Sequence, residues 1–243
     1  MTTRRQFLAA ALAFTAPAQR SWITLDLLHG SKSIHWRGAD DPVNMGSLLK
    51  PFLVLGYGAT HARFPVTRCG GVKDGCWSPR GHGTQDIVDG LANSCNVYFL
   101  SLANGIERAA LDSVCLSCGL TVPERDTTPA QLIGLGSGWP QAPAAVVAAF
   151  AALAQNRRQP NVDIALTGMA RCAASGTARA VGLACYAKTG TAPCTHTPHA
   201  AGDGFAVAIY PLVQPRNVLL LEQHGVTGAE TSRNVRSLLL KSE

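Results

Sequence analysis

The two ends of the chain alternate apolar and polar side chains in the manner of β-strands. Residues 22–27 and 33–36 show this alternation on either side of a turn at His29-Gly30-Ser31, which predicts a β-hairpin. Near the other end, three short apolar runs predict strands over residues 183–189, 204–210 and 217–223. We therefore expect strands at both ends of the chain and another kind of structure between them.

The middle of the chain follows helical spacing. Residues 86–103 place apolar side chains three and four positions apart, and residues 142–154 form a dense Ala/Val/Phe run typical of a buried helix. A shorter apolar helix is expected over residues 47–57. It should begin at about Ser47, because Pro51 is tolerated near a helix start and costly further in. The final helix is expected to be amphipathic, with one side formed by Val235, Leu238 and Leu239.

Strands and helices that segregate along the chain predict an α+β fold. We expect an antiparallel five-stranded sheet flanked by helices, with a helical subdomain. The chain has 243 residues, of which 47% are apolar and 15% charged, so it can bury a sizeable core. No repeat, low-complexity tract or linker divides it, and we expect a single domain over residues 19–243.

The first residues have the composition of an export signal. Arg4 and Arg5 precede an apolar run over residues 9–18 that is too short to span a bilayer. Ala16-Pro17-Ala18 offers the small residues at which a signal peptidase cuts. We expect residues 1–18 to be a twin-arginine signal peptide, and the rest to be exported to the periplasm or cell envelope, soluble or peripherally attached. The alternative is a chance Arg-Arg pair before a buried helix.

The charge of the chain argues against nucleic acid as a partner. The formal net charge is +6, and setting aside Arg4 and Arg5 leaves +4. This excess is mild and scattered, whereas nucleic-acid-binding proteins gather their basic residues in patches. Ordinary solubilising charge is the simpler interpretation.

Eight cysteines suit an exported protein better than a cytosolic one. Cys69 and Cys76 bracket a Gly-rich stretch within residues 63–83, and Cys115 and Cys118 form the one Cys-x-x-Cys. A zinc site at finger or ribbon spacing would need a second such pair, which the sequence lacks. Local disulfides are the favoured hypothesis, Cys69–Cys76 first, although spacing alone does not determine the pairing.

Three short motifs carry the candidate chemistry, and they follow one another as Ser47-Leu48-Leu49-Lys50, Ser94-Cys95-Asn96 and Lys188-Thr189-Gly190. The first two are each common by chance. All three in this order are rare by chance, and the set is typical of serine β-lactamases and penicillin-binding proteins.

Each motif has a physical rationale. Residues three apart on a helix share a face, so Lys50 can reach the Ser47 hydroxyl. A lysine kept neutral by burial and a neighbouring cation can then take the hydroxyl proton. Ser94 and Asn96 can direct a hydroxyl and an amide into the same cleft, where helix capping is their alternative role. Lys188, on a strand, can offer a cation to a carboxylate. The alternative interpretation is that it is an ordinary solvent-exposed lysine at the end of a strand.

The flanking residues turn the pattern into a family resemblance. Residues 46–52, 92–99 and 187–193 resemble the three signature regions of class B penicillin-binding transpeptidases. The segments Cys76-Trp77 with Gly81-His82-Gly83, and Ile133-Gly134-Leu135-Gly136, resemble the approaches to the second and third regions. The resemblance runs from about residue 22 to the C-terminus, and it implies the β-lactamase/transpeptidase-like fold.

This resemblance also implies an activity and a role for each motif residue. The chain would be a DD-transpeptidase or carboxypeptidase, in which Ser47 is acylated by a D-Ala-D-Ala stem peptide of peptidoglycan or by a β-lactam. Lys50 would be the acylation base, and Ser94 and Asn96 would assist proton transfer and substrate binding. Lys188 and Thr189 would hold the terminal carboxylate, Gly190 would lie on the substrate-binding strand, and the N–H groups of Ser47 and Thr191 would form the oxyanion hole. The implied partners are stem peptides, β-lactams and other cell-wall proteins, without nucleic acid, metal or organic cofactor.

Two alternatives stay open. A serine β-lactamase shares the motifs but needs a second base for deacylation, and none of Glu107, Glu124, Glu222, Glu230 and Glu243 lies in a context typical of that base. A non-catalytic penicillin-recognising sensor or scaffold is the other, because the chain resembles a bare catalytic domain without the usual amino-terminal pedestal. Beside the motifs, Cys95 is expected to be a small buried thiol and His82 to be structural.

Overall fold

A computed structural model describes residues 20–194 and 200–240, and the predicted signal peptide lies outside these residues. The described part contains a five-stranded sheet of order β2-β1-β7-β6-β5 in which every neighbouring pair is antiparallel. The predicted α+β class and five-stranded sheet are confirmed. The strands are β1 (Arg20–Asp26), β2 (Lys32–His35), β5 (Tyr186–Ala192), β6 (Asp203–Tyr210) and β7 (Asn217–His224).

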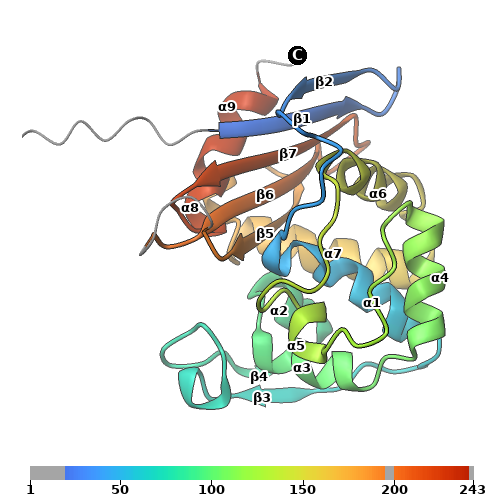
Figure 1. The fold of residues 1–243 in the computed structure, drawn as a ribbon, viewed down its shortest axis with the longest axis vertical. Helices are drawn as coiled ribbons and strands as arrows, with labels where there is room; N and C mark the ends of the chain where they lie inside the picture. The colour runs from blue at the N-terminus through green and yellow to red at the C-terminus, as the bar shows by residue number, and fades with distance from the viewer. Residues whose placement is uncertain (1–19, 195–199, 241–243) are drawn as a thin grey trace, which may run out of the picture.

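A larger group of helices packs on one face of the sheet and extends below it, and a smaller group packs on the other face (Figure 1). The larger group comprises α1 (Lys50–Gly58), α2 (Ile87–Ala92), α3 (Asn96–Asn104), α4 (Arg108–Cys118), α5 (Pro129–Leu132), α6 (Pro143–Gln155) and α7 (Pro160–Ala174). The smaller group comprises α8 (Gly228–Thr231) and α9 (Val235–Leu239). Short 3-10 helices complete the fold as η1 (Gly46–Leu49), η2 (Val72–Asp74), η3 (Arg179–Val181) and η4 (Ser232–Asn234).

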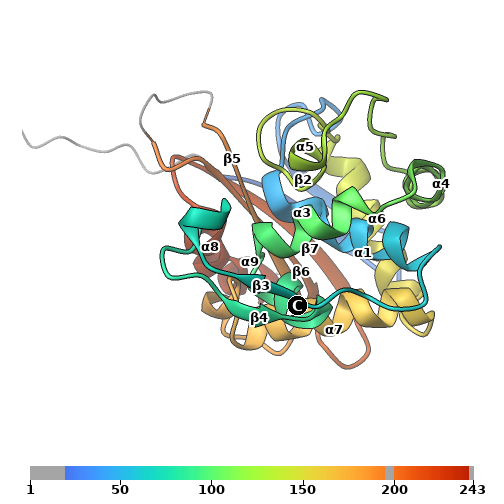
Figure 2. The same ribbon diagram turned by 90° about the horizontal axis from the view of Figure 1, so that it is seen from below.

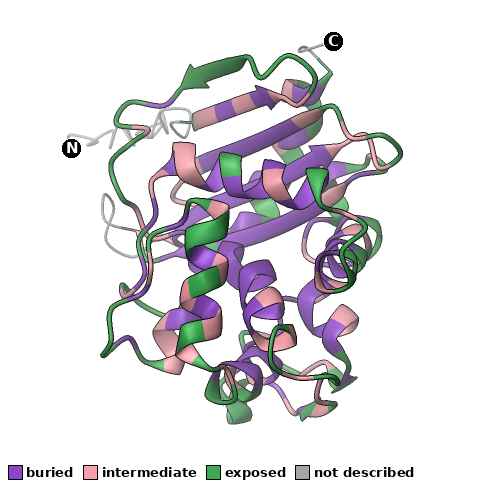
Figure 3. Cartoon of the chain, turned by 90° about the vertical axis from the view of Figure 1, so that its right-hand side faces the viewer, coloured by how far each residue is buried: buried purple, intermediate pink, exposed green. Residues whose placement is uncertain are grey.

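The central strands β6 and β7 are buried on both faces (Figure 3). Along β7, Val218 and Leu220 join the core shared with the larger group of helices, while Leu219 and Leu221 join the core under α9. Successive strand side chains point to opposite faces, so a strand covered on both sides needs an unbroken apolar run. The sequence of β7 supplies that run.

The first and last strands of the chain lie side by side. Residues 22–25 of β1 pair with residues 32–35 of β2, which confirms the predicted hairpin, and β1 also pairs along its length with β7. At the opposite edge of the sheet lies β5, which pairs only with β6 among the described strands. Among the described residues, the other edge of β5 therefore has no strand partner.

Two predicted helices are corrected by the structure. The helix expected over residues 86–103 is two helices, α2 and α3, because the backbone reverses at Ser94 with a left-handed φ of 51°. The helix expected to begin at Ser47 starts as the 3-10 turn η1, and regular α-helix begins only at Lys50. In both places the spacing of apolar residues correctly predicts helical structure. The exact point at which each helix begins or breaks depends on tertiary contacts, which the spacing does not show.

Two further differences concern the second half of the chain. Strand β5 begins at Tyr186, three residues later than predicted. The helix expected over residues 142–154, by contrast, is confirmed as α6. The fifteen-residue helix α7 was not predicted, although its buried Val162, Ala165, Leu166 and Met169 have helical spacing. It packs against both α2 and β5, and so connects the second and third motifs.

The segment between α1 and α2, which contains the Gly-rich stretch, forms a small antiparallel ribbon of β3 (Thr67–Cys69) and β4 (Gly83–Gln85). The ribbon lies at the end of the molecule far from β1 and β2, and it crosses in front of the helices in the view from below (Figures 1 and 2). Within the described residues, no helix is long and apolar enough to cross a membrane.

Candidate active site

The first motif lies where η1 passes into α1. Ser47 is half-buried on the 3-10 turn, while Lys50 is fully buried at the first residue of α1. Pro51 occupies the first turn of α1, where the missing N–H costs no helical hydrogen bond. The nucleophile candidate is therefore accessible, and the base candidate beside it is shielded from water.

The second motif receives hydrogen bonds from Lys50. The Lys50 Nζ donates to the backbone carbonyl of Ser94 at 3.0 Å and to Oδ1 of Asn96 at 2.9 Å. Trp77 Nε1 donates to the same Ser94 carbonyl at 3.3 Å. The left-handed backbone at Ser94 lets its carbonyl meet one lysine while its hydroxyl meets another.

That second lysine belongs to the third motif. Lys188, fully buried on β5, donates from Nζ to the Ser94 hydroxyl at 2.9 Å and to the Thr189 carbonyl at 2.6 Å. Ser94 thus connects Lys50 and Lys188. The hydroxyls of Thr189 and Thr177 are hydrogen-bonded at 2.6 Å, and Thr191 Oγ1 accepts from the N–H of Gly228 at 2.9 Å.

Gly190 allows β5 to lie directly against the turn that carries Ser47. A Cβ at this position would fall on the carbonyl oxygen of Met45 and would lie 3.0 Å from the backbone nitrogen of Leu48. Only a residue without a side chain permits this approach. The glycine of the third motif therefore determines how far β5 stands from Ser47.

A cavity of about 320 Å³ opens over these residues. This volume is at the lower end of the range for small-molecule sites. The described residues that line it include no aspartate, glutamate or histidine, and they are Ser47, Trp77, Ser94, Asn96, Gly134, Leu135, Thr177, Thr189, Gly190, Thr191, Thr227 and Ala229.

Burial sets the charge state of the two lysines. Burial first, and then the nearby charge of Lys188, hold the pKa of Lys50 well below its ordinary value. Burial lowers the pKa of Lys188 to about 8. Removing an ammonium group from water penalises its charged form, and a second cation adds to the penalty. Lys50 is thereby adapted to accept a proton, and Lys188 stays largely protonated at neutral pH.

The fold resembles those of solved penicillin-binding proteins. The structure resembles penicillin-binding protein PBP2 of Helicobacter pylori in complex with MreC, with a TM-score of 0.74 and 16% identity over 93% of this chain and 60% of that one. It also resembles PBP2 of Pseudomonas aeruginosa in complex with WCK 5153, with a TM-score of 0.73 and 16% identity over 93% of this chain and 73% of that one. A third similar structure is the transpeptidase domain of PBP3 of Burkholderia pseudomallei, with a TM-score of 0.73 and 15% identity over 93% of this chain and 88% of that one. The chain has the fold of a penicillin-binding transpeptidase domain.

The likeness is one of fold, and it spans part of the larger relatives. The chain covers 60% of the Helicobacter pylori protein and 55% of a similar chain from a peptidoglycan synthase complex. No protein-family model and no curated protein sequence matches the chain.

Within this transpeptidase fold, the structure brings all eight predicted site residues to one place. Six of them line the cavity, and Lys50 and Lys188 lie beneath it, bonded to Ser94. Sequence reasoning did not assign Thr177, Thr227 and Ala229 to the site, because they follow or begin helices that carry no motif. Trp77 was noted only as part of the family resemblance, and its hydrogen bond to Ser94 gives it a place in the site.

The predicted Cys69–Cys76 disulfide is wrong for this structure. Both cysteines are unbridged, as are Cys115, Cys118, Cys172 and Cys185. Cys95 is completely buried, as predicted. His82 Nδ1 lies 3.6 Å from the sulfur atoms of both Cys69 and Cys76, outside the cavity lining.

The left-handed backbone at Ser94 predicts how two substitutions there change the free energy of unfolding. Ser94→Gly and Ser94→Ala both remove the hydroxyl that Lys188 contacts, but only alanine keeps a Cβ in the left-handed region. That region costs an L-residue about 1 kcal/mol or more relative to glycine. We expect the glycine variant to be more stable than the alanine variant by about 1 kcal/mol in urea unfolding. Equal stabilities would show that the backbone at this position is not strained.

Proposed function

We propose that the chain is a serine acyltransferase that reacts with D-Ala-D-Ala stem peptides and with β-lactams. The observation that carries the proposal is the hydrogen-bonded series from Lys50 through Ser94 to Lys188, beside an accessible Ser47 in a cavity. Each group has a task in acyl transfer, and the fold is that of transpeptidase domains.

Acylation follows from the positions of these groups. Neutral Lys50 accepts the Ser47 proton as the hydroxyl oxygen attacks the penultimate D-Ala carbonyl carbon. The carbonyl oxygen becomes an oxyanion, which the N–H groups of Ser47 and Thr191 stabilise. When the carbon–nitrogen bond breaks, the departing D-Ala amine receives the proton. An acceptor amine or water then attacks the ester and returns a proton to Ser47.

The third motif holds the substrate for this attack. The cation of Lys188 is bonded to the Thr189 carbonyl, and Thr189 and Thr191 of the same strand line the cavity. A terminal carboxylate of a peptide, or the carboxylate of a penicillin, would be attracted to this strand. Asn96, fixed by Lys50, would bind a peptide group of the substrate.

The absence of an acidic lining favours transpeptidase over β-lactamase. Deacylation by water at a useful rate needs a base near the ester, and the described residues around the cavity offer no carboxylate. Glu230 instead caps the start of α8. We infer that the acyl-enzyme formed with penicillin is long-lived.

The partners and location are part of the same proposal. One structural neighbour is bound to MreC and another belongs to a peptidoglycan synthase complex. We propose that this chain likewise acts with cell-wall proteins, and that the Arg-Arg segment at its start directs it out of the cytoplasm. These assignments would place it next to its peptidoglycan substrate.

The test is covalent labelling with a fluorescent penicillin. We expect the purified protein to gain the mass of one penicillin, the adduct to map to Ser47, and the label to persist for many minutes. Rapid loss of label with release of penicilloate would indicate a β-lactamase. No adduct at millimolar penicillin, from protein with a cooperative unfolding transition, would contradict the proposal and favour the non-catalytic sensor or scaffold.

The two lysines also predict the pH dependence of acylation. The second-order rate constant is expected to fall on the acidic side as pH drops through the lowered pKa of Lys50, and to fall above about pH 8 as Lys188 loses its proton. The neighbouring ionisable groups are the other lysine, with Cys76 and Cys95 near Lys50 and Cys172 near Lys188. Lys188→Arg should move the basic limb upward, because arginine stays protonated. A basic limb that stays at the same pH in this variant would assign it to another group.

A further inference from the structure

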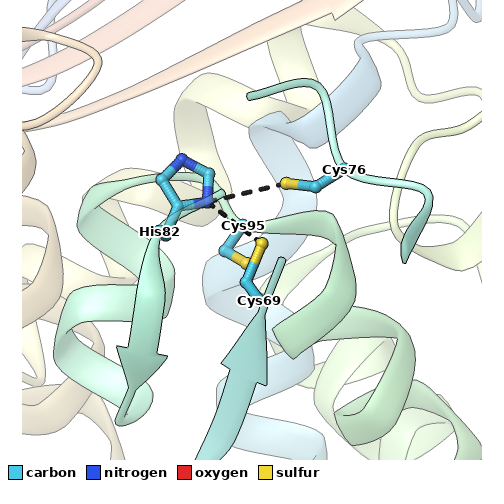
Figure 4. Close-up of side chains that lie close together, drawn as sticks. All are labelled: Cys69, Cys76, His82 and Cys95. Atoms are coloured by element: carbon cyan, nitrogen blue, oxygen red, sulfur yellow. Dashed lines mark hydrogen bonds between the residues drawn. The ribbon is translucent and has the colours of Figure 1, made fainter. Parts of the chain in front are cut away.

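Four side chains outside the cavity lining converge on one point. Cys69, Cys76, His82 and Cys95, which we call the Cys3His cluster, each place one ligand atom within 4.8 Å of the other three. Figure 4 shows the three sulfur atoms and the imidazole turned toward one another. Cys69 ends β3, Cys76 follows η2, His82 precedes β4, and Cys95 precedes α3.

The distances fit a tetrahedral metal ion. With zinc–sulfur bonds of about 2.3 Å and zinc–nitrogen bonds of about 2.05 Å, tetrahedral geometry separates sulfur and nitrogen by about 3.6 Å. In the structure, His82 Nδ1 lies 3.6 Å from the sulfur atoms of Cys69 and Cys76. A disulfide would need two sulfur atoms at about 2.05 Å and would leave the other two groups unused. We propose that the Cys3His cluster binds one Zn²⁺.

The burial of the surrounding segment gives an independent reason for a metal. Between residues 66 and 84, the only buried residues are Cys69, Gly71 and Cys76. The larger apolar side chains of this segment are more than half exposed, with exposed fractions of 68% for Val66, 63% for Val72 and 55% for Trp77. A segment without an apolar core needs another source of stability, which a bound metal supplies.

The composition of the cluster indicates a structural ion. Three thiolates and one imidazole complete a four-coordinate sphere, which leaves no open position for a substrate or a reactive water. Binding releases the thiol protons to solvent, so the filled site carries one net negative charge. Zinc is the divalent ion that this mixture of sulfur and nitrogen ligands favours.

The site would also hold the second motif in position. Cys95 lies between Ser94 and Asn96, both of which accept hydrogen bonds from Lys50. Trp77 follows Cys76 and donates to the Ser94 carbonyl. The ion would thus fasten the β3–β4 segment to the residues between α2 and α3, and fix the direction of the Ser94 hydroxyl.

Metal content of the purified protein tests the proposal directly. We expect one Zn²⁺ per chain by plasma mass spectrometry, and the same content in the matched control Cys118→Ser, which alters a half-buried cysteine outside the cluster. Cys69→Ser should lose the ion. His82→Cys should retain it, because a fourth thiolate completes the same sphere. Co²⁺ exchanged into the wild-type protein should show the visible bands of tetrahedral, thiolate-bound cobalt.

Two results would overturn the proposal without reference to the folding of any variant. One is wild-type protein that binds neither Zn²⁺ nor Co²⁺ after reduction and refolding with the metal. The other is a Cys69–Cys76 disulfide found by peptide mapping in metal-supplied cells. A further consequence rests on the proposed function: removing the ion should slow penicillin labelling on the order of 100-fold by displacing Ser94. Metal content and labelling are separate measurements, so either proposal can fail alone.

Discussion

Lys50→Met is expected to slow the reaction of Ser47 with penicillin by about 10³- to 10⁴-fold, because it removes the buried amine proposed to accept the Ser47 proton. The variant should nevertheless fold. Lys50 is completely buried and close to a second buried lysine, and methionine fills a similar volume without charge. Replacing a buried ionisable side chain with an apolar one is commonly neutral or stabilising by about 1 to 2 kcal/mol.

The direction of this stability change follows from the lowered pKa of Lys50. The folded state binds fewer protons than the unfolded state, so at neutral pH the lysine costs stability that is regained only as pH rises toward its ordinary pKa. The methionine variant should lose this dependence. Stopped-flow labelling gives the rate, and urea unfolding at pH 7 and pH 9 gives the stability.

Two control variants separate chemistry from folding. Lys73→Met changes an exposed lysine on η2 and should label at the wild-type rate. Ser47→Ala should fold normally and form no adduct. A Lys50→Met protein that is fully folded and labels at nearly the wild-type rate would remove Lys50 from the mechanism and require another base.

The candidate site could be predicted from sequence because each of its motifs is local. Ser47 and Lys50 are three residues apart, and so are close whatever the rest of the chain does. Ser94 and Asn96 flank one residue, and Lys188-Thr189-Gly190 is a single stretch of strand. Family resemblance supplied the remaining information, namely that these three pieces meet.

Other features were missed because they depend on contacts between distant segments. The break between α2 and α3 occurs at Ser94, where the carbonyl accepts from Lys50 and Trp77. A helical period continues through this break, so the pattern alone predicts one helix. Thr177 reaches the cavity only because α7 packs against β5, a contact that no motif encodes.

The Cys3His cluster was missed for a similar reason. Its ligands are separated by six, five and twelve residues, and none of these intervals matches the short cysteine pairs of zinc fingers or ribbons. The strands β3 and β4 and the turn before α3 bring them together. Cysteine spacing detects sites built on one hairpin, whereas a site assembled from four elements becomes visible only in the folded chain.

Gly190→Ala is expected to destabilise the protein by about 3 kcal/mol and to abolish penicillin labelling under conditions that saturate the wild type. The added methyl group would meet the Met45 carbonyl oxygen and the Leu48 backbone, which belong to the turn carrying Ser47. Neither is the movable end of a side chain, so β5 and η1 must separate. That separation would move Ser47 away from the N–H of Thr191 and from Lys188.

The comparison for this variant is Gly119→Ala. Gly119 has a φ of 72° at the end of α4, and a Cβ there would meet no atom within 4 Å. Its substitution should cost about 1 kcal/mol through backbone strain alone and leave labelling unchanged. Both variants are measured by urea unfolding and by labelling rate. The comparison separates the effect of a steric clash at residue 190 from the backbone strain caused by replacing any glycine of positive φ. If Gly190→Ala is no more costly than Gly119→Ala and still labels, β5 does not rest on the turn of Ser47, and the oxyanion hole must be sought elsewhere.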